Sequence, residues 1–187
     1  MTVQINYKSS SSKKNSTNYI LFVDEKFSIN GLKKYISNSE FLYISDLLKT
    51  SDLKKDLLFF KINSKKTIFL ASIKKDMKTS DIEGLGAKFH SYVDYKKNND
   101  YFVNSDSFTS KIKNFVGYFL HGLKLKSYEF NIYKSKKNKK LVSINIIGNE
   151  NKISVQDQLR FKALEEGTFF ARDLVSEPGN ILHPDEY

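Results

Sequence analysis

The sequence contains no cysteine, so it can form neither a disulfide framework nor a thiolate metal site. It also has no apolar run of about 18 residues, the length that a membrane-spanning helix needs. The polar N-terminus lacks the apolar core of a signal peptide. These absences predict a cytoplasmic protein with no membrane segment. Of its 187 residues 40% are hydrophobic, and the 15 phenylalanines among them can fill the core of a domain.

Arginine is scarce although the formal net charge is +10. Only Arg160 and Arg172 carry a guanidinium, the group that binds phosphates and base edges in bidentate fashion. The other basic residues are lysines, in a sequence rich in Asn, Ile, Phe and Tyr, as AT-rich codons would give. We interpret the charge as compositional and spread over a solvated surface. Nucleic-acid binding stays open as an alternative.

Short apolar runs alternate with segments of helical spacing along the chain. Strands are predicted at Val3–Tyr7, Tyr19–Val23, Leu57–Ile62, Thr67–Ile73, Tyr101–Val103 and Leu141–Ile147. Between them, helical faces are predicted around Phe41–Leu48, from a Ser80–Glu83 capping box to about Tyr95, and over Phe108–Leu123. Lys8–Ser16 reads as a mobile loop. This alternation predicts a three-layer α/β domain.

The C-terminal part predicts one long helix. Apolar or small residues at steps of three and four give it one face: Val155, Leu159, Ala163, Gly167, Phe170 and Leu174. Ser154 and Asp157 form a capping pair at its start, and Pro178 requires it to end. Leu182–Glu186 then reads as the start of another helix. We therefore expect the sequence to be the front piece of a longer protein.

Two segments of the sequence carry a family resemblance. The residues around Ala171–Val175 and Glu177–Leu182 resemble the segment that joins the two domains of the leucyl aminopeptidases (cytosol aminopeptidases, peptidase family M17). Upstream, His121–Lys134 resembles the G-x-x-L-x-S-Y-x-F-x-x-Y-K run of that family's N-terminal domain. One departure is His183, where the family usually has a threonine that caps the next helix.

The resemblance implies a domain organisation. The family's N-terminal domain is similar to a macro domain, with a mixed sheet flanked by helices. We expect a non-catalytic α/β domain over 1–150, an interdomain helix over 152–175, and the truncated start of the catalytic domain over 176–187.

The resemblance also implies an activity for the whole protein. The family is similar in using two divalent metal ions, zinc or manganese, to activate a water that attacks the peptide bond after an N-terminal residue. The metal ligands lie in the C-terminal domain, including an N-T-D-A-E-G-R motif that this sequence lacks. We therefore predict no catalytic, cofactor-binding or metal-binding residue here, and an inactive fragment. Peptide substrates and a homo-hexamer are implied for the full-length protein.

Few residues suggest chemistry by themselves. The three histidines lack partners at i, i+4 spacing and read as solvated or edge-of-core side chains: His90, His121 and His183. Glu83–Gly86 lacks the pattern of a phosphate-binding loop. Arg172 and Asp173 read as a helix-end arginine with an acid in an interdomain salt bridge.

The tract Lys134–Lys140 leaves two interpretations open. It is either a solvated loop or a phosphate-contacting patch with stacking residues at Tyr128, Phe130 and Tyr133. The alternation of Tyr128, Phe130 and Ile132 favours a strand with these side chains on its buried face. The alternative function is therefore a stand-alone basic α/β module that binds nucleic acid or a nucleotide.

Overall fold

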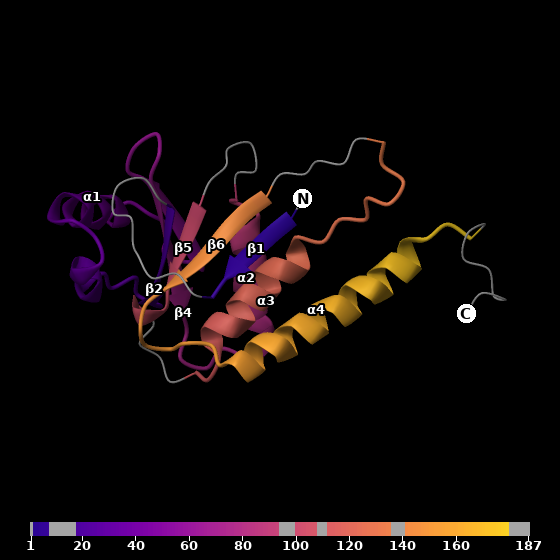
Figure 1. Ribbon diagram of the computed structural model, residues 1–187. Helices are drawn as coiled ribbons and strands as arrows, with labels where there is room; N and C mark the ends of the chain where they lie inside the picture. Colours follow the sequence, from indigo (N-terminus) through magenta and orange to yellow (C-terminus); the bar gives the residue numbers. More distant parts are fainter. Residues whose placement is uncertain (1, 8–17, 94–99, 108–111, 136–140, 180–187) are drawn as a thin grey trace.

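A six-stranded mixed sheet forms the centre of the molecule (Figure 1). The computed structural model describes residues 2–7, 18–93, 100–107, 112–135 and 141–179. The strand order is β1-β6-β5-β2-β4-β3, and all neighbouring pairs are parallel except β3 with β4. The strands are β1 (Thr2–Asn6), β2 (Asn18–Asp24), β3 (Leu57–Lys61), β4 (Thr67–Ile73), β5 (Asp100–Asn104) and β6 (Leu141–Ile147).

Helices cover both faces of this sheet. One face packs against α1 (Asn38–Leu48) and the 3₁₀ turn Asn30–Lys34, and the other against α2 (Thr79–His90) and α3 (Phe115–Lys126). The long helix α4 (Val155–Ser176) lies along α3, and its C-terminal end projects past the sheet (Figure 1). The predicted three-layer α/β fold is confirmed. Within the described ranges, no helix is both long and apolar enough to cross a membrane.

Strand β2 is buried on both faces, as its continuous apolar run predicts. Ile20 and Phe22 point into the core under α2 and α3, whereas Tyr19, Leu21 and Val23 point into the core under α1. Because successive side chains point to opposite faces of the sheet, β2 contributes to the apolar core on each face.

N-terminal caps determine the residues at which α1 and α2 begin. In α1 the Ser37 hydroxyl accepts from the Glu40 amide, and the Glu40 carboxylate accepts from the Ser37 amide at 2.9 Å. The capping box predicted at Ser80 and Glu83 is wrong, because α2 begins earlier, where the Asp81 carboxylate accepts from the Lys78 amide at 3.0 Å. Helix α2 ends at His90, five residues before the predicted end.

Two further predicted elements differ from the structure. Helix α3 begins at Phe115, after Asn114 in a left-handed conformation with φ of 55°; the predicted start at Phe108 lies outside the described residues. Tyr128–Ile132 forms no strand, and Ile132 is exposed. No strand forms there because Tyr128 packs on α4 and Phe130 packs on Tyr133, and neither pairs with a neighbouring strand. The predicted mobile loop Lys8–Ser16 also lies outside the described residues.

Helix α4 confirms its predicted ends but not its predicted packing face. The Ser154 hydroxyl accepts from the Asp157 amide at 3.1 Å, and the helix ends at Ser176, before Pro178. The apolar stripe, however, is exposed from Val155 to Phe170, with Leu159 at 63% and Phe170 at 66%, and only Leu174 is half-buried. Another face packs on α3 and on the segment after it, at Phe161, Phe169 and Arg172.

Candidate functional site

Helices α2 and α3 meet backbone to backbone at two glycines. A Cβ on Gly86 would lie 1.9 Å from the Phe119 carbonyl oxygen, and one on Gly122 would lie 2.0 Å from the Glu83 carbonyl oxygen. Only glycine allows this approach, because it has no Cβ. The crossing forms one wall of a surface pocket.

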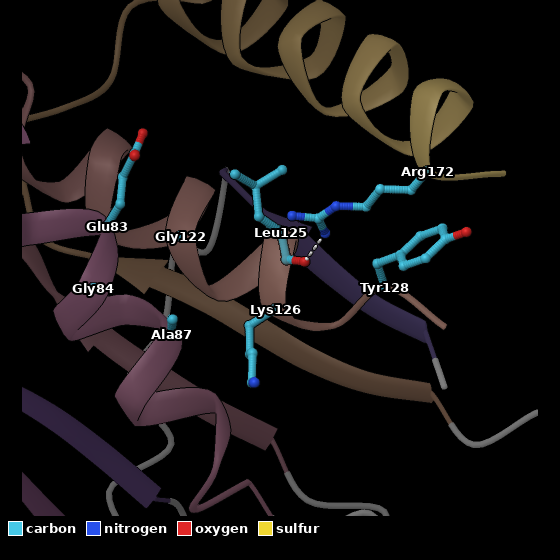
Figure 2. Close-up of a pocket in the computed structure, with 8 residues that line it drawn as sticks. All are labelled: Glu83, Gly84, Ala87, Gly122, Leu125, Lys126, Tyr128 and Arg172. Atoms are coloured by element: carbon cyan, nitrogen blue, oxygen red, sulfur yellow. Dashed lines mark hydrogen bonds between the residues drawn. The ribbon is translucent and has the colours of Figure 1, made fainter. Parts of the chain in front are cut away.

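This pocket of about 430 Å³ lies between α2, α3, the segment after α3 and the C-terminal half of α4 (Figure 2). Figure 2 shows Arg172 reaching from α4 toward Leu125, beside the ring of Tyr128, while Glu83 and Lys126 point in other directions. The residues that line the pocket are Glu83, Gly84, Ala87, Gly122, Leu125, Lys126, Tyr128 and Arg172. Its charged groups therefore do not converge on one point.

Polar contacts attach the C-terminal half of α4 to the segment after α3. The Arg172 guanidinium donates to the Leu125 carbonyl at 2.6 Å and lies over the Tyr128 ring. The Tyr128 hydroxyl donates to Asp173 at 2.7 Å, and the Tyr133 hydroxyl donates to the Glu177 carboxylate. We call these contacts the α4 joint.

The α4 joint changes the interpretation of Arg172 and Asp173. In the part of the chain that the structure describes, neither forms the predicted salt bridge. Their partners are a helix-end carbonyl and a tyrosine hydroxyl, because the loop after α3 folds back under α4. Desolvation and the Asp173 carboxylate raise the pKa of Tyr128. The hydroxyl therefore stays protonated as a hydrogen-bond donor.

The structure gives one histidine a partner that sequence reasoning missed. His121 is buried on α3, and its Nδ1 lies 2.8 Å from a carboxylate oxygen of Glu83 on α2. Its Nε2 has no hydrogen-bond partner among the described residues, and its ring packs against Phe161. Burial and Lys126 lower the pKa of His90, and His183 lies outside the described residues.

The missed pair spans 38 residues and depends on how α2 and α3 cross. Gly86 and Gly122 mark where the two helices touch, so they are the sequence signal from which this pair could have been predicted. Among the described residues, no group of three His, Asp or Glu side chains is placed to hold a metal ion.

The aromatic residues near the lysine tract contact other side chains of the molecule. Tyr128 packs on Phe169 with ring centroids 5.3 Å apart, and Phe130 packs on Tyr133 at 5.8 Å. Much of the lysine tract, 136–140, lies outside the described residues. The arrangement of the described side chains is therefore that of a structural joint.

Beyond the carboxyl ends of β5 and β6, an internal carboxylate binds backbone amides. Parallel α/β sheets bind ligands beyond this end, where free backbone amides attract anions. Here Asp106 accepts from the amide of Asn149 at 2.9 Å and from that of Glu150 at 2.7 Å. Ser105 donates to the Glu150 carbonyl at 2.7 Å. These amides already have an anionic partner.

Known proteins resemble this chain in both sequence and fold. No protein-family model matches it. It is 32% identical over 77 residues to a probable cytosol aminopeptidase of Methylobacterium radiotolerans, and 34% identical over 96 residues to one of Clostridium perfringens. These stretches cover 38% and 48% of the chain but only 15% and 20% of the two relatives. A solved tomato leucine aminopeptidase mutant superposes with a TM-score of 0.70 at 18% identity, over 98% of this chain and 40% of that one.

Sequence and fold together relate the chain to the leucyl aminopeptidases. The predicted family resemblance is thereby confirmed, and the mixed six-stranded sheet matches the N-terminal domain of these enzymes. The chain spans less than half of the length of the relatives that it matches. A further solved structure, the bottromycin maturation enzyme BotP in complex with Mn, superposes with a TM-score of 0.62 at 11% identity, over 91% of this chain and 34% of that one.

Proposed function

We propose that this chain is the non-catalytic N-terminal part of a dinuclear-metal leucyl aminopeptidase that releases N-terminal amino acids from peptides. In this proposal 1–150 forms the domain, 152–175 the interdomain helix and 176–187 the start of the catalytic domain. The observation that carries it is the C-terminal half of α4. The α4 joint holds this half on one side, while Phe170 and Val175 on its other sides are exposed. Large apolar side chains exposed together suit a surface that further protein covers.

The catalytic chemistry then belongs to residues outside this chain. Two divalent ions, manganese or zinc, would polarise the peptide carbonyl and lower the pKa of a bridging water. The manganese in the BotP complex supports a metal-dependent relative. We assign no catalytic, cofactor-binding or metal-binding residue to this chain, and we propose a cytoplasmic homo-hexamer for the full-length enzyme.

The alternative, a stand-alone module for nucleic acid or nucleotides, has less support. Among its candidate stacking rings, Tyr128 packs against Phe169 and Arg172, and Phe130 packs on Tyr133. Asp106 already binds the backbone amides at the carboxyl end of the sheet, where a nucleotide phosphate would be held. Both observations favour the aminopeptidase proposal.

The experiment mixes this chain with the separately produced catalytic domain of the Clostridium perfringens relative. We expect a complex in size-exclusion chromatography, and no turnover of leucine p-nitroanilide with Mn²⁺ by this chain alone. Phe170→Glu should abolish the complex because it places a charge in an apolar contact. The matched control is Leu42→Glu, at an equally exposed position on α1, across the sheet. Turnover by the chain alone, or equal effects of both variants, would contradict the proposal.

A further inference from the structure

Two aromatic rings beside the C-terminal end of α2 are exposed although they contact each other. Phe59 on β3 is 45% exposed and Tyr92, just after α2, is 43% exposed, and their ring centroids lie 5.2 Å apart. Both rings also contact Phe69 on β4, and Phe69 in turn contacts Tyr101 on β5. Phe69 and Tyr101 are buried. The four rings together form an aromatic wall that the domain leaves partly open.

A side-chain amide lies beside the aromatic wall, at the start of β2. The sheet register pairs Asn18 with Tyr101, and it places Phe59 opposite Phe69. The Asn18 Oδ1 accepts from the Thr67 amide at 3.1 Å, which leaves Nδ2 as a donor. Asn18 is only 8% exposed, and among the described residues its Nδ2 has no hydrogen-bond partner. A ligand oxygen would satisfy this donor.

The aromatic wall and the Asn18 amide line one pocket of about 430 Å³. Small-molecule sites have volumes of about 300–1,000 Å³, with apolar and aromatic walls and a few polar groups. The other side chains that line this pocket are polar or basic and come from the end of β3 and the turn that follows it. None of the described lining residues is an acid.

Lys61 and Lys65 give the pocket a positive charge. In the part of the chain that the structure describes, neither lysine forms a salt bridge, whereas the adjacent Lys66 pairs with Glu40 at 2.6 Å. The turn that carries Lys65 is held by Asn63, whose Oδ1 accepts from the amides of Lys65 and Lys66 at 2.8 Å. The two unpaired cations favour an anionic ligand.

We propose that this pocket binds a small molecule that carries an aromatic ring and a carboxylate or phosphate. The ring would pack on the exposed faces of Phe59 and Tyr92. Lys61 and Lys65 would neutralise the anionic group, and the Asn18 Nδ2 would donate to an oxygen of the ligand. None of these residues belongs to α4 or to the α4 joint, so the proposal is independent of the association with a catalytic domain.

The test measures the binding of two fluorescent probes, naphthyl phosphate and naphthylacetate, to the full chain by fluorescence anisotropy. Saturable binding is expected because each probe joins an aromatic ring to an anion, and the tighter probe identifies the preferred anionic group. Naphthylmethanol has the ring without the charge, so it should bind about tenfold more weakly. Equal binding of this uncharged alcohol would overturn the proposal.

Two polar variants test the amide and the lysines. Asn18→Asp keeps an oxygen for the Thr67 amide but replaces the Nδ2 donor with a negative charge, so it should weaken the binding of both anionic probes by about tenfold or more. Lys61→Gln should weaken the binding of the anionic probes and leave that of naphthylmethanol unchanged. The matched control is Lys54→Gln, at an exposed lysine outside the pocket, which should change neither.

A third variant tests the aromatic wall. Phe59→Ala should weaken the binding of all three probes, whereas Phe170→Ala, which removes an exposed ring of α4, should not. Circular dichroism checks that each variant is folded, and Phe59→Ala decides alone if Asn18→Asp unfolds. Binding of the anionic probes that Phe59→Ala leaves unchanged would overturn the proposal. So would displacement of the probes by a single-stranded oligonucleotide at lower concentrations than unlabelled phenyl phosphate requires, since the occupant would then be a nucleic acid.

Discussion

Alanine at Gly86 should destabilise the domain, whereas alanine at Gly84, two residues earlier on the same helix, should not. A Cβ at Gly86 would meet only backbone: the Phe119 carbonyl oxygen at 1.9 Å, its carbon at 2.9 Å and the Leu123 nitrogen at 3.0 Å. A Cβ at Gly84 would meet nothing within 4 Å. The two substitutions therefore share their chemistry and differ only in what α3 places beside them.

The magnitude follows from two opposing contributions. Alanine gains about 1 kcal/mol over glycine in a helix interior. The atoms that a Cβ at Gly86 would meet belong to the backbone of α3, so no change of rotamer can move them away. Increasing the distance between this Cβ and the Phe119 carbonyl oxygen from 1.9 Å to an ordinary 3.4 Å therefore requires the helices to part by about 1.5 Å. Overpacking of this kind costs about 1–3 kcal/mol and occasionally more. We expect a net loss of about 2 kcal/mol for Gly86→Ala and a gain of up to about 1 kcal/mol for Gly84→Ala.

Urea unfolding followed by circular dichroism measures both changes. In thermal unfolding the loss at Gly86 should lower Tm by about 4–8 °C, at about 2–4 °C per kcal/mol for a domain of this size. Gly122→Ala should act in the same direction, since its Cβ would lie 2.0 Å from the Glu83 carbonyl oxygen. The double variant Gly86→Ala with Gly122→Ala should lose less than the sum, because one separation of the helices relieves both contacts. Equal stability of Gly84→Ala and Gly86→Ala would refute the close crossing.

Two other perturbations test separate parts of the fold. Phe161→Ala should lower the free energy of unfolding in urea by about 3–5 kcal/mol, because Phe161 is 2% exposed and attaches α4 to α3. Phe170→Ala, at an exposed position of the same helix, should lower it hardly at all. Equal losses of stability in the two variants would contradict the assignment of the packing face. Hydrogen bonds from Lys88 and Lys74 lower the pKa of Asp56, so its stabilisation is present at neutral pH and is lost as pH falls through the lowered pKa. Asp56→Asn should therefore flatten the acid side of a plot of Tm against pH, and an unchanged slope would show that the pairs contribute nothing.

Sequence reasoning succeeded where one local pattern permits one structure. The run Tyr19–Val23 is apolar at every position, which predicts a strand that is buried on both faces. In the structure β2 lies inside the sheet, between β5 and β4. The ends of α4 were predictable for a similar reason. Ser154 supplies a cap, and Pro178 cannot continue a helix, so local chemistry determines both ends.

It failed where two patterns coexist and only tertiary contacts choose between them. Helix α4 carries the apolar stripe and, on another face, Phe161 and Phe169. The second face is the one that packs on the domain, because it meets Tyr118 and Tyr128. The candidate site posed the same difficulty: Glu83 and His121 come together only through the crossing of α2 and α3, which no local spacing encodes.

The rotation of α4 about its axis is set at two points, and this explains why an apolar stripe remains exposed. Near its start, Phe161 fills a space left by Gly117, where a Cβ would lie 2.4 Å from the ring. Two turns past its middle, Arg172 satisfies the Leu125 carbonyl, one of the orphan acceptors at the end of α3. Rotating α4 to bury Leu159 and Phe170 would remove Phe161 from its space and leave that carbonyl without its partner. The exposed stripe is therefore a consequence of how the helix is attached, and among the described residues Leu159 and Phe170 remain exposed for that reason.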